Sequence, residues 1–283
     1  MEKFEWKRVS IIGVGLMGGS FAAALRKAGL AKEIIGVGRT VKNLKVAKRR
    51  GWIDRYTSHL KEGVQGADLV FVSVPVLSIP PLIEKIEPFV SNETILIDVG
   101  SVKGPIVKRL SSHLKHPERF VGCHPIAGTE QSGAQAAFPS LFEGKLCLIT
   151  PVKETHRLAL EKVQKTWSAI GAKVQRIDAE KHDQIFACVS HLPHIVAYAL
   201  VGTLLQIDPS MLRYSGGGFR DFTRIAKSSA EMWQDICMMN QTAILKALNR
   251  YEKVIGRLSQ MIRRGNSSQL LRFFQKAREL RTH

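Results

Sequence analysis

The sequence predicts an α/β protein in which a doubly wound domain with a parallel sheet precedes an all-helical domain. From Arg8 to Asp178, short apolar runs alternate with amphipathic stretches, which is the pattern of repeated strand–helix–strand units. After Asp178 the strand-like runs stop, and apolar residues recur at the three- and four-residue spacing of helices. We therefore expect a sheet domain over residues 1–178 and a helical domain over residues 179–283.

The element boundaries follow from where each pattern begins and ends. Strands are expected at Val9–Ile12, Glu33–Val37, Leu69–Val74, Thr94–Val99, Phe120–Gly122, Leu146–Ile149 and Lys173–Ile177. Helices are expected between them at Gly18–Ala28, Val41–Arg50, Pro81–Phe89, Pro105–Leu114 and His156–Ile170. In the second domain, helices are expected at about Ala179–Gln206, from about Phe222 to Arg264, and at Ser267–Leu280.

The composition is that of a globular protein with a strong positive charge. The 283 residues are 45% hydrophobic and carry a net charge of +18. The positive charge is spread along the chain without a basic tail, so we expect anionic small molecules rather than nucleic acid as partners. The N-terminal residues are too charged for a signal peptide, and no apolar stretch reaches membrane-spanning length. The four cysteines form no C-x-x-C pair, which fits a cytoplasmic protein.

The segment Gly13-x-Gly15-x-x-Gly18 follows a predicted strand and opens a predicted helix. This context indicates a Rossmann-type dinucleotide site, in which the glycines permit a tight turn, approach of the pyrophosphate and close helix packing. Free N–H groups of the helix bind phosphate oxygens. The candidate cofactor residues are Gly13, Gly15, Leu16, Met17, Gly18, Arg39, Thr40, Val74 and Pro75.

The end of the second strand decides between NAD and NADP. NAD sites place an acidic side chain there to bind the ribose hydroxyls, but this chain has Gly38-Arg39-Thr40. Arg39 and Thr40 offer donors that suit a 2′-phosphate. NADP is therefore slightly favoured, while an Arg39 that only stacks on adenine would leave NAD acceptable.

Ser101 and His124 each follow a predicted strand, where ligands of parallel sheets bind. A hydroxyl and an imidazole beside a nicotinamide could orient and deprotonate a substrate alcohol, although a histidine there is often structural. A hydrolase triad of Ser101, His124 and Asp98 is disfavoured because the G-x-S-x-G pattern is missing.

The helical domain adds two polar segments, Ser190–His194 and Gly216–Ala226. The His-x-x-His pair of the first lacks a carboxylate or cysteine to complete a ligand set, so no metal is expected. In the second, Arg220 and Arg224 lie one helical turn apart and could bind carboxylates, or could pair with acids on a solvated helix. The apolar helices favour a homodimer.

Five segments in order resemble the prephenate dehydrogenases, a family that includes arogenate and cyclohexadienyl dehydrogenases: residues 15–20, 98–103, 124–130, 190–194 and 216–226. The resemblance covers nearly the whole chain. It implies NAD(P)-dependent oxidative decarboxylation of prephenate to 4-hydroxyphenylpyruvate in tyrosine biosynthesis. Many NAD-dependent members have an acid where this chain has Gly38, so the cofactor preference does not transfer.

The resemblance also implies roles for individual residues. His124 would bond the ring hydroxyl of the substrate with assistance from Ser101, and Arg224 would bind a carboxylate. His194, Thr129 and Glu130 would line the substrate pocket, and Asp221 and Trp233 would shape it. Because the chain ends at His283, we expect no appended regulatory domain.

Two rival functions predict different features. A β-hydroxyacid dehydrogenase would also suit the glycine loop and Arg39, and it would need a catalytic lysine, for which Lys181 is the nearest candidate. A nicotinamide-sensing regulator would use the basic surface to bind nucleic acid, with strong salt dependence.

Overall fold

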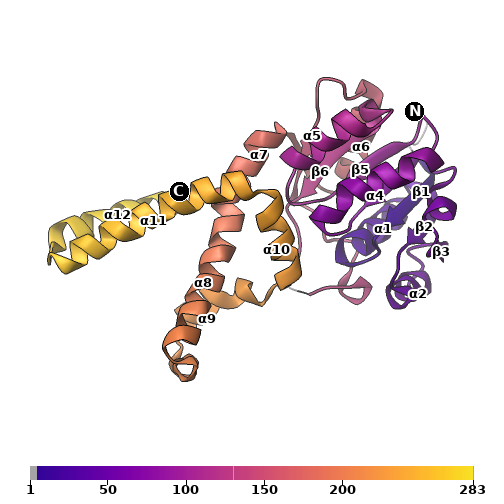
Figure 1. Ribbon diagram of the computed structural model, residues 1–283. Helices are drawn as coiled ribbons and strands as arrows, with labels where there is room; N and C mark the ends of the chain where they lie inside the picture. Colours follow the sequence, from indigo (N-terminus) through magenta and orange to yellow (C-terminus); the bar gives the residue numbers. More distant parts are fainter. Residues whose placement is uncertain (1–4, 130, 283) are drawn as a thin grey trace.

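The protein is described from a computed structural model, which defines residues 5–129 and 131–282. One eight-stranded sheet forms the core of the first domain, in the order β3-β2-β1-β4-β5-β6-β7-β8 (Figure 1). The strands are β1 (Trp6–Ile12), β2 (Ala31–Val37), β3 (Arg55–Thr57), β4 (Leu69–Val72), β5 (Ile95–Asp98), β6 (Phe120–Pro125), β7 (Leu146–Thr150) and β8 (Lys173–Arg176). The predicted fold class is confirmed. Strand β3 was not predicted, because its three residues form no apolar run.

All neighbouring strands are parallel except β6 and β7, which are antiparallel. The described residues between Pro125, the end of β6, and Leu146, the start of β7, form no crossover helix. Because no such helix returns the chain to the amino ends of the parallel strands, β7 runs back antiparallel to β6. The sheet is therefore mostly parallel rather than wholly so, and the 126–145 connection stays at the carboxyl end of β6.

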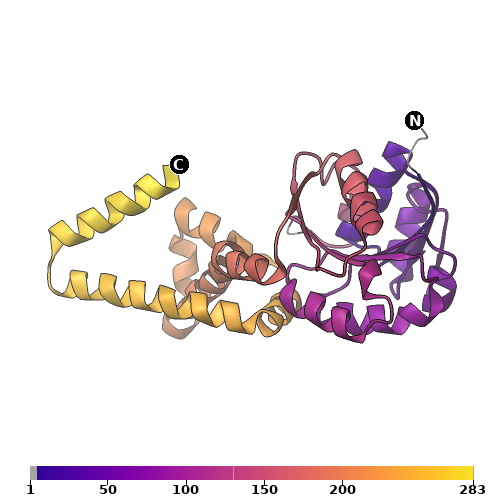
Figure 2. The same cartoon turned by 90° about the horizontal axis from the view of Figure 1, so that it is seen from above.

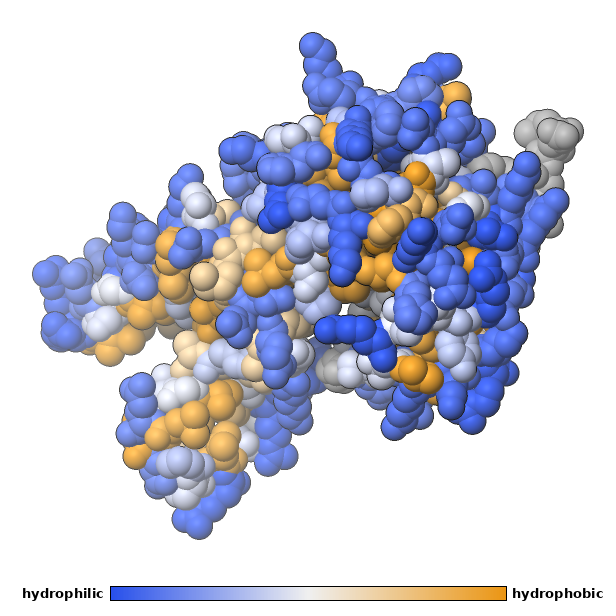
Figure 3. Space-filling model, turned by 45° about the vertical axis from the view of Figure 1, so that its right-hand side comes forward, coloured by the Kyte–Doolittle hydropathy of each residue, from blue (hydrophilic) through white to orange (hydrophobic). Residues whose placement is uncertain are grey.

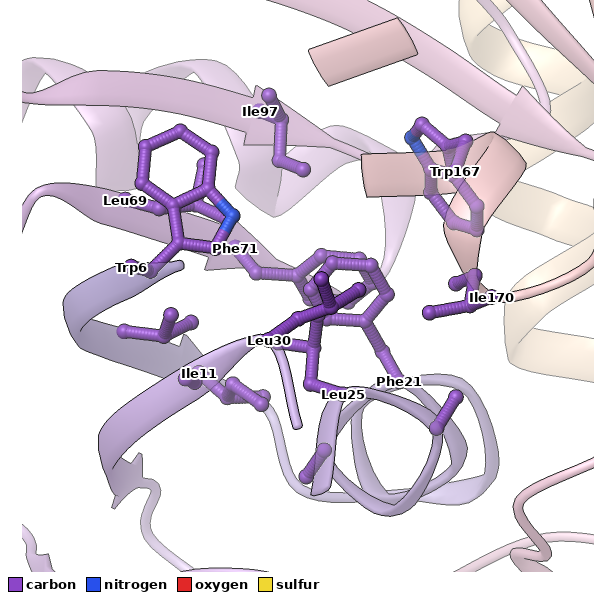
Figure 4. Close-up of a cluster of buried hydrophobic side chains, with 14 of the residues drawn as sticks. Trp6, Ile11, Phe21, Leu25, Leu30, Leu69, Phe71, Ile97, Trp167 and Ile170 are labelled. Carbon is purple, nitrogen blue, oxygen red and sulfur yellow. The ribbon is translucent and has the colours of Figure 1, made fainter. Parts of the chain in front are cut away.

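Helices cover both faces of the sheet (Figures 1 and 2). In the sheet domain they are α1 (Leu16–Ala28), α2 (Val41–Arg49), α3 (Leu60–Val64), α4 (Ile79–Ile86), α5 (Gly104–His113) and α6 (Arg157–Ala169). Short 3₁₀ turns lie between them, including η4 (Ala134–Ala136). Figure 4 shows the core between the sheet and α1 with α6, where Phe21 stacks on Phe71 with ring centroids 4.0 Å apart and Trp167 packs beside both.

The second domain is helical, as expected, and extends away from the sheet (Figure 1). Its elements are α7 (Ala179–Phe186), a π-helical turn (Ala187–His191), α8 (Leu192–Ile207), 3₁₀ turn η6 (Pro209–Tyr214), α9 (Gly217–Thr223), 3₁₀ turn η7 (Arg224–Lys227), α10 (Ala230–Met239), α11 (Gln241–Arg263) and α12 (Ser267–Thr282). The long helix expected from Phe222 to Arg264 is in fact broken. Breaks fall at Ser228–Ser229, where the Ser229 hydroxyl caps α10, and at Asn240.

The helical stretch Ala179–Ile207 is long and apolar enough to cross a membrane by length and composition alone, contrary to expectation. The expectation failed because polar residues interrupt the apolar run in this stretch, yet its mean hydropathy stays as high as that of a membrane-spanning helix. Three of those polar residues, His182, His191 and His194, make hydrogen bonds inside the protein. The stretch therefore supplies polar side chains to hydrogen bonds inside the protein.

Candidate active site

A cavity of ≈ 520 Å³ lies at the carboxyl ends of β1, β2 and β4. Six of the nine candidate cofactor residues line it, namely Gly13, Gly15, Arg39, Thr40, Val74 and Pro75. Leu16, Met17 and Gly18 belong to the first turn of α1, directly below it. The N-terminus of α1 has no side-chain cap, so its first N–H groups remain available to phosphate oxygens.

The glycines of the loop meet distinct steric demands. Gly13 has a φ of +90°, and a Cβ there would lie 2.3 Å from the carbonyl oxygen of Ser73. A Cβ at Gly18 would lie 2.3 Å from the carbonyl oxygen of Gly13. At Gly15 nothing lies within 4 Å of a Cβ, so this position faces open space. The loop thus fits a dinucleotide: two glycines hold its shape, and the third leaves room for the pyrophosphate.

The end of β2 carries no carboxylate toward this cavity. Gly38, Arg39 and Thr40 line it, followed by Asn43 and Leu44 from α2. The side chains of Arg39 and Thr40 are exposed and form no hydrogen bond with the described part of the protein. Both are therefore available to a ligand in the cavity.

A second cavity, of ≈ 650 Å³, lies between the end of β6 and helices of the second domain. It brings together six of the predicted site residues, which are Ser101, His124, Thr129, His194, Arg224 and, as a residue expected to shape the pocket, Trp233. These residues come from the turn after β5, from β6 and its following loop, from α8, from η7 and from α10. Glu130, which was predicted beside Thr129, lies outside the described residues.

His124 begins a chain of hydrogen bonds that sequence reasoning missed. Its Nδ1 lies 2.8 Å from Nε2 of His182, and Nδ1 of His182 lies 2.8 Å from Oδ1 of Asp183. The Asp183 carboxylate accepts two more hydrogen bonds, from the backbone N–H groups of Lys103 and Gly104 at the start of α5. The Asp183 carboxylate therefore faces hydrogen-bond donors and acts only as an acceptor here.

The ionised Asp183 fixes the proton positions along this chain. His182 must donate from Nδ1 to the carboxylate, which leaves its Nε2 as an acceptor. His124 must then donate from Nδ1 to His182, which leaves Nε2 of His124 with a lone pair. Because His124 lines the cavity, that lone pair can accept a proton from a ligand there.

The surroundings also keep His124 neutral. Burial holds the pKa of His124 well below its usual range, and the neighbouring His182 imidazole and Lys103 ammonium lower it further. Burial lowers the pKa of His182 as well, although the hydrogen bond to Asp183 acts in the opposite direction. An imidazole in this setting is unprotonated near neutral pH and ready to act as a base.

A buried ion pair supports the main chain behind His124. The side chains of Lys103 and Asp98 are fully buried and form a salt bridge. The Lys103 ammonium also donates a 2.8 Å hydrogen bond to the carbonyl of Cys123, the residue before His124. Asp98 therefore pairs with Lys103 and not with His124. This pairing excludes the hydrolase triad of Ser101, His124 and Asp98 that the sequence analysis considered.

The other wall of the cavity is aromatic. The His194 ring stacks on Trp233 with centroids 3.8 Å apart, and its Nδ1 lies 2.9 Å from the carbonyl oxygen of Ser190. His191 is buried, and its Nδ1 lies 3.1 Å from Nδ2 of Asn240, which also donates to the carbonyl of Asp183. Burial lowers the pKa of His191 to about 4. These rings form a rigid apolar surface that suits a flat or cyclic ligand.

Several other candidates lie outside this cavity. Among the described residues, neither Asp221 nor Arg220 lines it, and Arg220 donates instead to the hydroxyl of Ser215. Lys181, the candidate named for a β-hydroxyacid dehydrogenase, is exposed and does not line it either. No group of three or more possible metal ligands occurs in the part of the chain that the structure defines.

Sequence reasoning missed four contributors besides Asn240. His182 and Asp183 were overlooked because they lie in a helix distant in sequence from His124. Lys103 was named only as part of a motif. Lys145, the residue just before β7, lines the cavity but was not considered. The adjacent His182-Asp183 pair just after the helix-capping Asp178 was the available signal.

Comparisons with known proteins agree over nearly the whole chain. The family model described as prephenate dehydrogenase, nucleotide-binding domain, matches residues 21–176, and the one described as its dimerization domain matches residues 178–276. The chain is 32% identical to the cyclohexadienyl dehydrogenase of Zymomonas mobilis over 98% of this chain and 95% of that protein. It is also 32% identical to the prephenate dehydrogenase of Bacillus subtilis, over 96% of this chain and 75% of that one.

Solved structures show the same relationship. A prephenate dehydrogenase from Aquifex aeolicus, in complex with hydroxyphenyl propionate and NAD⁺, superposes with a TM-score of 0.94 at 38% identity, covering 99% of both chains. The arogenate dehydrogenase of Synechocystis superposes with a TM-score of 0.81 at 30% identity, covering 97% of this chain and 99% of that one. The two cavities described above therefore belong to a nicotinamide-dependent oxidoreductase, and the chain is a member of the prephenate dehydrogenase family.

Proposed function

We propose that the protein oxidises and decarboxylates prephenate to 4-hydroxyphenylpyruvate, with NADP or NAD as the acceptor. The observation that carries this proposal is the His124–His182–Asp183 chain, because it presents a neutral imidazole nitrogen to a cavity that Arg224 also lines. Prephenate has a ring hydroxyl and two carboxylates, and these groups require a proton acceptor and a cation.

The residues of the chain divide the work of the reaction. The bound nicotinamide would take the hydride from the ring carbon that bears the hydroxyl. His124 Nε2 accepts the hydroxyl proton as the ring carboxylate leaves as CO₂ and its bonding electron pair makes the ring aromatic. The imidazolium formed in this way then returns the proton to the phenolate oxygen, which gives 4-hydroxyphenylpyruvate. His182 and Asp183 stabilise the resulting imidazolium, since the Nδ1 proton of His124 can shift toward His182.

Residues in the walls of the cavity would bind the substrate. We assign carboxylate binding to Arg224 and a supporting role at the hydroxyl to Ser101. Thr129, and Glu130 by its place in the sequence, would line the pocket. His194 donates Nδ1–H to Ser190, and a nearby substrate carboxylate would favour its protonated form, in which Nε2 also donates.

The cofactor preference is a separate proposal. We infer that NADP is slightly preferred, because Arg39 and Thr40 line the cavity where an acid would repel a 2′-phosphate, and Gly38 leaves space beside them. The related Aquifex protein was solved with NAD⁺, so both cofactors must be compared. Arg39→Ala should lower kcat/KM for NADP by about 10- to 100-fold, the range for a hydrogen bond to a charged group, and for NAD by much less.

One steady-state comparison tests the proposal. Initial rates are measured with prephenate and with arogenate, each with NAD and with NADP. We expect turnover of prephenate, with a higher kcat/KM for NADP. No reduction of either cofactor with either substrate would refute the function, and a preference for arogenate would correct the substrate.

We further propose that the sheet domain ends at residue 178 and that the helical domain forms a homodimer. The helices of that domain expose large apolar side chains, and Figure 3 shows the resulting hydrophobic surface on the lobes they form. Those that are more than half exposed are Val189, Leu205, Ile207, Tyr214, Met238, Ile262, Leu271, Phe274 and Leu280. A second copy would cover such a surface. Light scattering should give twice the mass of one chain, and a monomer at micromolar concentration would contradict this.

The same apolar surface is relevant to where the protein lies in the cell. We propose that the exposed side of Ala179–Ile207 meets a second copy rather than lipid, because this stretch carries histidines of the active site. A cytoplasmic protein should stay in the supernatant after cell fractionation without detergent. We also propose that nucleic acid is not a partner, and salt-dependent binding to DNA would contradict that.

A further inference from the structure

The loop formed by residues 126–138, of which all but Glu130 are described, lies between the two cavities. Its first residues, from Ile126 to Thr129, line the substrate cavity, and so does Phe138 at its far end. The 3₁₀ turn Ala134–Ala136 lies between these parts and contacts α1 and α2 of the cofactor-binding region. The loop therefore joins the substrate wall to the elements that hold the dinucleotide.

The loop rests closely on α1, just after the glycine motif. A Cβ at Gly19 would lie only 2.9 Å from the Cβ of Ala137. The backbone N–H of Phe138 donates a 3.1 Å hydrogen bond to the buried hydroxyl of Ser20. Gly19 thus permits contact with the substrate loop, a role different from those of Gly13, Gly15 and Gly18.

Helix α2 holds the same loop from its other side. Nη1 of Arg50, the residue that directly follows α2, donates to the carbonyl oxygens of Gln135 and Ala137 at 3.3 and 3.2 Å. The Arg50 guanidinium also lies over the Trp52 ring, 4.8 Å from its centroid. Arg50 is not one of the described residues that line the two cavities. It therefore contacts the loop without contacting either ligand site.

The beginning of α2 faces the cofactor cavity. Thr40, Asn43 and Leu44 line that cavity. Asn43 also accepts a 3.5 Å hydrogen bond through Oδ1 from the backbone N–H of Ala134 in the loop. A helix of nine residues therefore contacts the cofactor site at one end and anchors the substrate loop at both ends.

We propose that α2 couples the two sites: a dinucleotide seated against Thr40 and Asn43 fixes α2, and Arg50 then holds the substrate loop in its binding position. Arg50 is a positioning residue in this scheme. Because linkage is reciprocal, bound substrate must tighten cofactor binding by the same factor. The inference rests on the proposed function for its substrate, but its loop and helix contacts do not depend on which substrate binds.

The experiment measures cofactor affinity by tryptophan fluorescence, with and without saturating 4-hydroxyphenylpropionate. In the wild type the probe should tighten NADP binding by about 5-fold or more, the usual lower bound for coupled sites. Arg50→Ala should reduce this factor to less than about twofold, and should leave the affinity for NADP alone nearly unchanged. Arg49→Ala removes the same charge from the adjacent exposed position and should keep the wild-type factor.

Hydrogen exchange provides a second readout that needs no substrate. NADP alone should slow amide exchange in residues 131–138 of the wild type and of Arg49→Ala, but not of Arg50→Ala. Equal protection and equal coupling in the wild type and Arg50→Ala would overturn the proposal, as would equal losses in the two arginine variants. Failure to turn over prephenate or arogenate would refute the proposed function and would leave the exchange result to decide the coupling.

Discussion

The cofactor cavity and the substrate cavity are built in different ways. The first is lined by residues 12–82, a single continuous part of the chain, and its shape depends on close backbone contacts at Gly13 and Gly18. The second takes its lining from residues 101–236 and depends on buried charges and imidazoles behind its wall. Steric fit thus shapes one site, while electrostatic interactions among distant residues shape the other.

The largest effect that this comparison predicts concerns the buried ion pair behind the substrate cavity. Lys103→Met leaves the Asp98 carboxylate buried without its partner, which should lower the free energy of unfolding by about 3–5 kcal/mol. Denaturant titration measures the change. Lys108→Met, on the exposed side of the same helix, should cost little. Equal losses for both lysines would show that the buried pair has no special role.

Arg224→Ala tests the substrate side without disturbing the core. The arginine is exposed and lines the cavity, so its loss should raise the KM for prephenate by about 10- to 100-fold, the range for a hydrogen bond to a charged group, with a smaller effect on kcat. Steady-state kinetics separates the two constants. A change confined to kcat would remove Arg224 from substrate binding.

Gly15→Ala tests the cofactor side. A Cβ here meets no protein atom, so the fold should be unaffected while cofactor affinity falls by about tenfold because the pyrophosphate loses its close approach. Gly13→Ala is the matched variant, since its positive φ and its contact with Ser73 should reduce stability as well. The two melting temperatures should therefore differ, and identical values would contradict the steric account of the loop.

The smallest effect is a pH dependence that comes from the substrate side. Folded His191 has a pKa of about 4 against an ordinary value of 6.5, so below 6.5 the unfolded state binds more protons and stability falls with pH. His191 alone should contribute about 1 kcal/mol of loss one pH unit below 6.5. Unfolding titrations at two pH values measure this. A His191→Asn variant with an unchanged pH slope would contradict the assignment.

The same contrast explains how far the sequence could predict the molecule. The glycine loop, the strand preceding it and the helix following it are consecutive, so local pattern was enough to place Gly13 and Gly15 in one cavity. His124 was a candidate because it follows a predicted strand, and Arg224 because it could bind a carboxylate. The family resemblance gave both residues their specific roles, and both line the other cavity.

What could not be predicted depends on tertiary contacts. The bond from His124 to His182 joins residues 58 positions apart, and no periodicity indicates such a pairing. The Arg50 contacts to the loop span 85 and 87 positions, and Arg50 looks like any basic residue at the end of a helix. The break before α10 was missed because the apolar spacing continues through Ser228 and Ser229.

The central claim is that His124 is the base of the reaction, and the variant His124→Ala tests it most directly. With prephenate and the preferred cofactor both saturating, we predict that kcat falls by about 100-fold or more, because a positioned base contributes at least that much. Cofactor affinity should stay the same, since His124 does not line the cofactor cavity. A variant that keeps wild-type kcat would contradict the account.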